Sequence, residues 1–139
     1  TMENTITVTA LVNNDLQKTW ECYTQPQHIT KWNFATVEWQ CPLATNELKA
    51  GGKYFARMEA KDGSFGFDFE AIYDEIWEYK KLAYTMLDGR KATILFDEIE
   101  ATTKVEISFD AEMENPIDMQ RDGWQAILNN FKKYTESRG

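Results

Sequence analysis

The chain has 139 residues, a length that fits one folded domain with a sizeable core, and we expect residues 1–139 to form a single domain. Its formal net charge of −8 disfavours partners that present phosphates, so we expect neither a nucleic acid nor a membrane surface as a partner. No apolar run approaches the roughly 18 residues of a membrane span. Aromatic residues make up 14% of the chain, a high share that requires a structural or functional reason.

The first residues and the cysteines indicate the compartment. The opening stretch TMENTITVTALV has no basic flank and alternates apolar with polar residues, unlike a signal peptide. Cys22 and Cys41 do not form a CxxC pair, and we expect both to be reduced thiols. We therefore expect a cytoplasmic protein.

A strand and two helices are predicted at the start of the chain. Residues 5–12 (TITVTALV) alternate and are rich in β-branched side chains, as in a half-buried strand. Asn14, with Gln17 three residues later, predicts a capping box at the start of a helix. Pro26 stops that helix and can open a second, short one at PQHITKW.

Strands and turns are predicted for the middle of the chain. We expect a strand at residues 35–40, followed by a loop that contains Pro42. Gly51-Gly52 is predicted to form a turn into a further strand at residues 53–61.

Two Asp-Gly pairs predict tight hairpin turns. Asp62-Gly63 suits a two-residue type I′ turn, in which both residues take positive φ, and Asp88-Gly89 looks like a second hairpin turn. The first turn fixes the register of its strands and pairs Arg57 with Asp68 on the polar face of the hairpin. The opposite face is apolar and carries Ala56, Met58, Ala60, Phe65, Phe67 and Phe69.

A long helix is predicted after the last strand. Asn115 is expected to cap this helix, with Pro116 in its first turn. Its apolar residues follow the i, i+3, i+4, i+7 spacing of one buried stripe, and a helix of about 20 residues spans roughly 30 Å, enough to lie across a sheet. The stripe consists of Trp124, Ile127, Leu128 and Phe131.

The expected order is a strand, two helices, about six strands and a long helix, an α+β arrangement of antiparallel hairpins with helices on one face. Five stretches carry a resemblance: ITVTALVNNDLQKTWECYTQPQHITKW, GGKYFARMEAKDGSFGFDFEAIYDE, YTMLDGRKATILF, TKVEISF and GWQAILNNFKKYTES. With these residues the chain resembles the START-like superfamily, which has the helix-grip fold. More closely, it resembles the family named for the C-terminal domain of the Hsp90 ATPase activator.

The resemblance implies a fold and a cavity. The order β-α-α-β6-α is expected to form a curved antiparallel sheet wrapped around the long C-terminal helix, with a cavity between them. Members of the superfamily bind lipids, sterols, hormones or polyketides in that cavity, and some catalyse reactions on the bound molecule. Because one fold hosts many functions, the resemblance does not fix the function of this chain.

Three functions stay open at this point. The expected one is the binding of an apolar small molecule, of unknown identity, without catalysis. The second is a protein-interaction module like the co-chaperone of the family, linked to stress response. That co-chaperone also uses an N-terminal domain, whereas this sequence opens directly at its first strand, which disfavours literal activation of Hsp90. The third is an enzyme of the cyclase or hydrolase type that acts on an apolar ligand.

Eleven residues are candidates for the wall of the cavity. For each ring the alternative is simple packing in a solid core, and both interpretations stay open. A glycine inside a helix costs about 1 kcal/mol relative to alanine, so Gly123 suggests that room is needed there for a strand or a ligand. The candidates are Trp32, Trp39, Met58, Phe67, Phe69, Tyr84, Phe96, Gly123, Trp124, Leu128 and Phe131.

The remaining polar residues indicate no catalytic or metal site, and we expect no metal and no cofactor. His28 is the only histidine, is expected at the surface, and has no partner at the spacing of metal ligands. Glu59, Asp68 and Glu70 fall on the polar face of their hairpin, away from the rings. The expected partner is an apolar small molecule, with a protein as the alternative, and the chain is expected to be a monomer or a homodimer.

Overall fold

The computed structural model describes residues 4–138, so the first three residues of the amino-terminal stretch and Gly139 lie outside the described part. The elements follow the expected β-α-α-β6-α order. They are β1 (Thr5–Val12), α1 (Leu16–Thr24), α2 (Pro26–Ile29), β2 (Trp39–Asn46), β3 (Lys53–Ala60), β4 (Gly66–Trp77), β5 (Lys81–Met86), β6 (Lys91–Ile99), β7 (Thr102–Asp110) and α3 (Ile117–Ser137).

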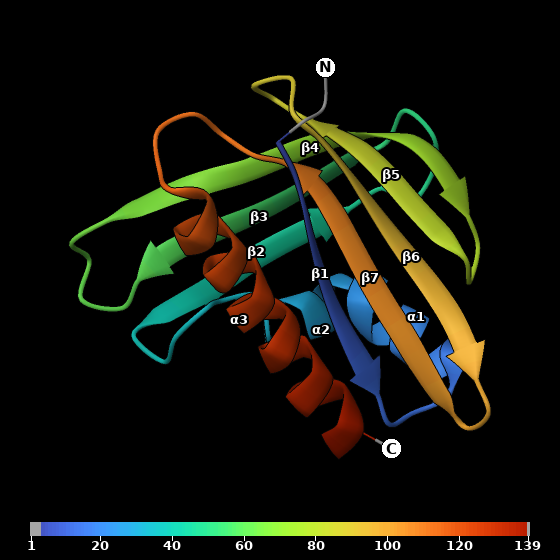
Figure 1. Ribbon diagram of the computed structural model, residues 1–139. Helices are drawn as coiled ribbons and strands as arrows, with labels where there is room; N and C mark the ends of the chain where they lie inside the picture. Colours follow the sequence, from blue (N-terminus) through green and yellow to red (C-terminus); the bar gives the residue numbers. More distant parts are fainter. Residues whose placement is uncertain (1–3, 139) are drawn as a thin grey trace.

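The seven strands form one antiparallel sheet in the order β1-β7-β6-β5-β4-β3-β2 (Figure 1). From β2 to β7 each strand pairs with the next one in the chain. β1 instead pairs with β7, and Thr5 lies opposite Asp110. The sheet curves, with the long helix α3 across one face and α1 and α2 at one end (Figure 1). The α+β helix-grip fold is thereby confirmed.

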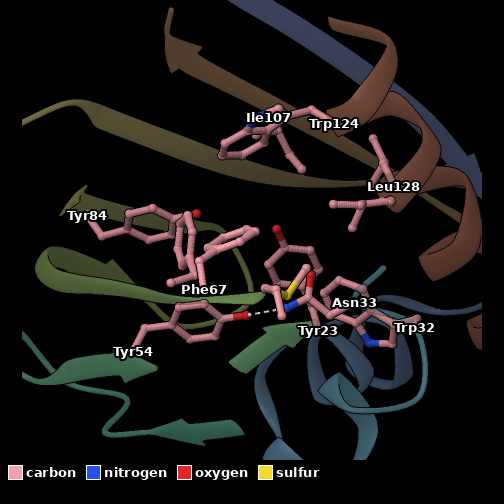
Figure 2. Close-up of a pocket in the computed structure, with 12 residues that line it drawn as sticks. Tyr23, Trp32, Asn33, Tyr54, Phe67, Tyr84, Ile107, Trp124 and Leu128 are labelled. Carbon is pink, nitrogen blue, oxygen red and sulfur yellow. Dashed lines mark hydrogen bonds between the residues drawn. The ribbon is translucent and has the colours of Figure 1, made fainter. Parts of the chain in front are cut away.

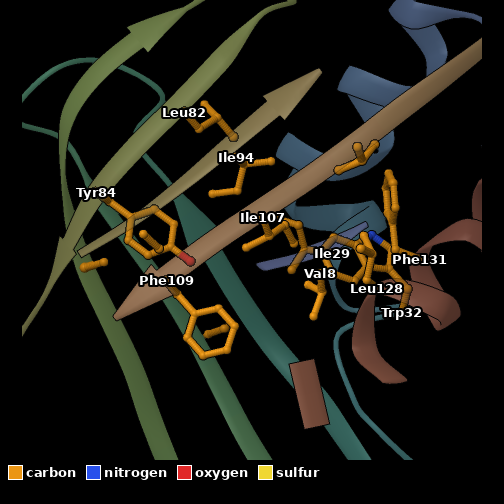
Figure 3. Packing of buried hydrophobic residues seen from close by; sticks show 14 of the residues in the cluster. Val8, Ile29, Trp32, Leu82, Tyr84, Ile94, Ile107, Phe109, Leu128 and Phe131 are labelled. Atoms are coloured by element: carbon orange, nitrogen blue, oxygen red, sulfur yellow. The ribbon is translucent and has the colours of Figure 1, made fainter. Parts of the chain in front are cut away.

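The helix α3 packs chiefly against β1, at one edge of the sheet. Trp124 stacks on Phe109 of β7 with ring centroids 3.9 Å apart. About two turns further along the helix, Phe131 is fully buried, and its ring lies 5.0 Å from the rings of both Tyr23 and Trp32. The apolar stripe predicted for this helix therefore faces the core, where residues of strands and helices meet (Figure 3).

Both predicted helix caps were placed on the wrong residue. Asp15, not Asn14, caps α1, because its Oδ1 accepts a hydrogen bond from the Lys18 amide at 2.7 Å. Asn14 instead donates its side-chain amide to the carbonyl of Thr135, at 3.0 Å, and so connects the start of α1 to the end of α3. Pro116 occupies the cap position of α3 without a side-chain bond.

At the start of α3 the side chain of Gln120 satisfies backbone groups that the predicted Asn115 cap does not reach. Gln120 Nε2 donates to the carbonyl of Asn115 at 2.7 Å, and its Oε1 accepts from the Glu112 amide at 2.9 Å. Asn115 itself is bonded to the carboxylate of Glu112. A buried glutamine one turn into the helix thus organises the loop before it.

The strand predicted at residues 35–40 is misplaced. The strand β2 covers Trp39–Asn46, and Pro42 lies inside it rather than in a loop. The pairing of β2 with β3 is irregular between Gln40 and Leu43. Because β2 is an edge strand and is bulged at this point, the missing N–H of the proline removes no necessary ladder bond.

The turn between β3 and β4 differs from the predicted type, although the register is as predicted. Gly63 has φ of +79°, but Asp62 is not among the residues of the described chain with positive φ, so the turn is not type I′. The Gly63 amide bonds the carbonyl of Ala60 at 3.0 Å, which makes a longer loop. Met58 still lies opposite Phe67 and Arg57 opposite Asp68, because both loop types close the hairpin at the same pairs.

We expect that Phe131→Ala lowers the free energy of unfolding by about 3–5 kcal/mol, because it empties the fully buried space between two aromatic rings. The control is Met119→Ala on the same helix, where the side chain is 59% exposed and the change should stay within about 0.5 kcal/mol. Urea unfolding followed by circular dichroism measures both. Equal midpoints for the two variants would contradict the packing of α3.

Candidate ligand cavity

A cavity of about 160 Å³ lies between α3 and the concave face of the sheet (Figure 2). In Figure 2 the side chains of Trp124, Ile107 and Leu128 line one side of it, and those of Tyr54 and Phe67 lie opposite. The lining residues come from α1, the segment after α2, β3, β4, β5, β7 and α3. They are Tyr23, Trp32, Asn33, Tyr54, Met58, Phe67, Phe69, Tyr84, Ile107, Trp124, Ile127 and Leu128.

The structure brings seven of the eleven candidate residues to this cavity. They come from the apolar face of the β3–β4 hairpin, the neighbouring strand β5, the segment after α2 and the stripe of α3. The seven are Trp32, Met58, Phe67, Phe69, Tyr84, Trp124 and Leu128.

Two of the other four candidates are buried behind the cavity wall. Phe96 packs on Trp20 and on Tyr23, with ring centroids 5.0 and 5.6 Å away. Phe131 lies against the rings of Tyr23 and Trp32. Both residues point into the core instead of lining the cavity, where they were expected, and each contacts the lining residue Tyr23.

The remaining two candidates lie to the side of the cavity. Trp39 contacts Phe65 and Phe67 near the tip of the β3–β4 hairpin, with ring centroids 5.9 and 6.2 Å away. Gly123 lies one turn before the lining residue Ile127, and a Cβ atom on it would meet no atom within 4 Å beyond its chain neighbours and the adjacent helix backbone. The helix therefore has open space at Gly123, although the glycine itself is not part of the wall.

Five lining residues were not among the candidates, and the sequence held a signal for three of them. Tyr54 lies two residues before Ala56 in the hairpin, on the same face, and Ile127 belongs to the predicted stripe of α3. Ile107 alternates with buried neighbours in β7. Tyr23 shares one face of α1 with Leu16 and Trp20, but nothing in the sequence assigned that face to the cavity. Asn33 follows α2 in a segment without periodicity.

Few polar groups reach the cavity. The side-chain amide of Asn33 donates weakly to the hydroxyl of Tyr54, at 3.4 Å, and lies 3.9 Å from the sulfur of Cys41. The hydroxyls of Tyr23 and Tyr84 have no hydrogen-bond partner among residues 4–138. By contrast Tyr73, which lies outside the cavity, donates to Asn46 Oδ1 at 2.8 Å.

The buried phenols affect one another electrostatically. Burial, reinforced by the neighbouring tyrosines, raises the pKa of Tyr54 and of Tyr84 well above the ordinary value. Burial also raises the pKa of Tyr23 and of Tyr73. All four phenols are therefore neutral at physiological pH, and each keeps a hydroxyl proton that it can donate.

The other groups weighed for chemistry lie away from the cavity wall. His28 is partly buried rather than at the surface, because its Nδ1 is hydrogen-bonded to the Tyr134 hydroxyl at 2.6 Å; burial and the nearby Arg138 lower its pKa. Arg57 pairs with Asp68 and with Glu59, both at 3.1 Å, on the polar face of the hairpin. Within residues 4–138 no group of three or more His, Cys, Asp or Glu side chains has the arrangement of a metal site.

The family model described as Activator of Hsp90 ATPase homolog 1-like protein matches residues 14–136, most of the chain. The chain belongs to this family. A solution structure of an AHSA1-like protein from Aeromonas hydrophila is 34% identical, with a TM-score of 0.91, over 97% of this chain and 94% of that one. A solution structure of a protein from Cytophaga hutchinsonii is 47% identical, with a TM-score of 0.84, over the same shares.

More distant members of the fold agree on its architecture. A crystal structure of a protein from Chromobacterium violaceum has a TM-score of 0.85 at 18% identity, over 96% of this chain and 98% of that one, and it shows the fold alone. No curated protein matches the chain. Within the described residues, no helix of the chain is both long and apolar enough to cross a membrane.

We expect Tyr23, Tyr54, Tyr73 and Tyr84 to stay protonated as the pH passes 10. The rise in absorbance at 295 nm near pH 10 should therefore be smaller than the rise that ionisation of all six tyrosines would produce. Because the pKa of each phenol is raised in the folded state, its contribution to stability is complete below about pH 10. This contribution is lost as the pH rises further. The absorbance of the four buried phenolates should therefore appear together with loss of the far-ultraviolet circular dichroism signal.

The control for this titration is the same protein in guanidinium chloride, in which all six tyrosines should titrate near pH 10. If all six did so while the circular dichroism signal was intact, the burial of the phenols would be wrong.

Proposed function

We propose that the protein binds an apolar small molecule in the cavity between the sheet and α3. The observation that carries this proposal is a partly open cavity whose lining is aromatic and aliphatic, apart from three phenols and one amide. Ligand sites in proteins commonly combine such an apolar wall with a few polar groups that orient the ligand.

The volume limits what fits. A cavity of about 160 Å³ is close to the roughly 150 Å³ that hold a benzene-sized molecule, and well below the roughly 300–1,000 Å³ of sites for drug-sized ligands. The proposed ligand is therefore the size of one ring, or the ring-sized end of a longer molecule. Phe67, which lines the cavity and is 43% exposed, marks where such a molecule would extend outward.

The lining favours binding over catalysis. Its polar members are Tyr23, Asn33, Tyr54 and Tyr84, which can donate hydrogen bonds but, with neutral phenols, offer no strong base. Proton transfer to or from a bound molecule needs an acid and a base matched to the operating pH. We also propose that the protein binds its ligand in the cytoplasm, in keeping with the two free, buried cysteines.

Ethylbenzene, a one-ring hydrocarbon, should raise the melting temperature of the wild-type protein in a concentration-dependent way, because it binds only the folded chain. Ile127→Phe should remove the rise, since the larger side chain grows into the cavity from α3. Met119→Phe also introduces a phenylalanine on α3, but at an exposed site, and this variant should still show the rise in melting temperature. A wild-type melting temperature that ethylbenzene leaves unchanged would overturn the proposal.

A second function is favoured by the rings at the tip of the β3–β4 hairpin. Phe65 is 62% exposed and forms a cluster with Trp39 and Phe67. Exposed apolar groups of this kind often mark a surface for protein partners. Association through this hairpin would make the sedimentation coefficient of the wild type rise with protein concentration, and Phe65→Ser would remove that rise. A sedimentation coefficient of the wild type that is independent of concentration would argue against a homodimer.

A further inference from the structure

Two of the three phenols on the cavity wall are unpaired. Tyr84 is only 7% exposed, yet its hydroxyl has no partner in the described chain, and the same holds for the hydroxyl of the partly buried Tyr23. Among residues 4–138 the one fully buried side-chain polar atom without a partner is Thr135 Oγ1, so the hydroxyl oxygens of Tyr23 and Tyr84 are not sealed in the core but reach open space. A hydroxyl without a hydrogen bond is unfavourable and is normally paired with protein or with water. An unpaired hydroxyl that borders empty space is available to a ligand.

The other buried phenols show that this fold can satisfy tyrosines where it needs to. Tyr73 donates to Asn46, and Tyr54 is contacted by Asn33. The rings of Tyr73 and Tyr54 lie 6.0 and 6.1 Å from the ring of Tyr84, so all three share one neighbourhood. Tyr84 and Tyr23 also line the cavity, but unlike Tyr73 and Tyr54 they have no side-chain partner for the hydroxyl within the described residues (Figure 2).

We propose that the hydroxyls of Tyr23 and Tyr84 recognise an uncharged hydrogen-bond acceptor, such as a carbonyl oxygen, on the ring-sized molecule that occupies the cavity. This inference rests on the proposed binding function and specifies its ligand class. Tyr23 enters from α1 and Tyr84 from β5, on different parts of the wall. A carbonyl oxygen has two lone pairs and can accept a hydrogen bond from one hydroxyl or from both hydroxyls.

The acceptor is uncharged because nothing on the wall can balance a charge. Lys, Arg, His, Asp and Glu are all missing from the lining residues. Taking a carboxylate or an ammonium group out of water without a partner of opposite charge is strongly unfavourable. The burial that raises the pKa of both phenols also prevents them from serving as phenolate partners for a cation.

The test compares three probes of similar size: acetophenone, ethylbenzene and benzoate. Dissociation constants are measured at pH 7 by chemical-shift titration of ¹⁵N-labelled protein. We expect acetophenone to bind more tightly than ethylbenzene by roughly fivefold to thirtyfold, as one or two neutral hydrogen bonds would give. Benzoate should bind more weakly than either neutral probe.

Three hydroxyl deletions assign the effect to residues. Tyr23→Phe and Tyr84→Phe remove only the oxygen, and each should reduce the preference for acetophenone over ethylbenzene by about fivefold, while the double variant should abolish it. Tyr73→Phe is the matched control, because it deletes a buried hydroxyl that is already bonded to Asn46 outside the cavity. It should keep the preference even where it lowers stability.

The outcomes separate this inference from the proposed function. If both neutral probes bind equally in the wild type, or if the double variant keeps the preference, the recognition by Tyr23 and Tyr84 is wrong while cavity binding stands. If benzoate binds best, the uncharged ligand class is wrong. If no probe shifts the resonances of cavity residues, both the proposed function and this inference fail.

Discussion

The structure depends on how a single helix covers the concave face of a seven-stranded sheet. The helix α3 packs along β1, at one edge, where Gln125 donates to the carbonyl of Thr9 at 3.0 Å. The rings of β3, β4 and β5 therefore face α3 across a space instead of through close packing. Aromatic side chains suit this arrangement, because they contribute a large apolar area with few rotamers to restrict. The high aromatic content of the chain thus has a structural reason.

That geometry also explains why unpaired polar groups can persist inside an otherwise apolar fold. A solid core would have to pair or exclude the hydroxyls of Tyr23 and Tyr84, since an unpaired buried hydroxyl is unfavourable. Next to a cavity the same hydroxyls can bond a guest molecule or water. The cavity and its phenols are therefore one feature, and a change to either alters what the other can bind.

Periodic signals in the sequence predicted the order of the elements, and the family resemblance implied the helix-grip fold. Alternation in β1 and β7 and the stripe of α3 give the order of elements, and the Asp62-Gly63 pair gives the register of the β3–β4 hairpin, which the structure confirms. Helix caps and the boundaries of strands were less predictable. Asp15 and Asn14 are both good capping residues, and only the contact of Asn14 with Thr135, far along the chain, decides between them.

The same limit applies to the cavity wall. Seven of eleven candidates line it because strand alternation and helical spacing assign a side chain to a face. Periodicity does not say how deep along that face a side chain lies, so Phe96 and Phe131 could not be separated from their neighbours. Asn33 follows α2 in an irregular segment, where its position is set by tertiary contacts alone.

The pairing of β1 with β7 has a consequence for the order of assembly. The strands β2 to β7 form a meander whose neighbours are consecutive in the chain and can pair by local steps. β1 must wait for β7, since Thr5 pairs with Asp110, and closing so long a loop is entropically slow. The helix α3 rests mainly on β1, so its platform does not exist before that closure. The aromatic face is therefore exposed to solvent through most of folding, which makes the nascent chain vulnerable to association until the last strand and helix are in place.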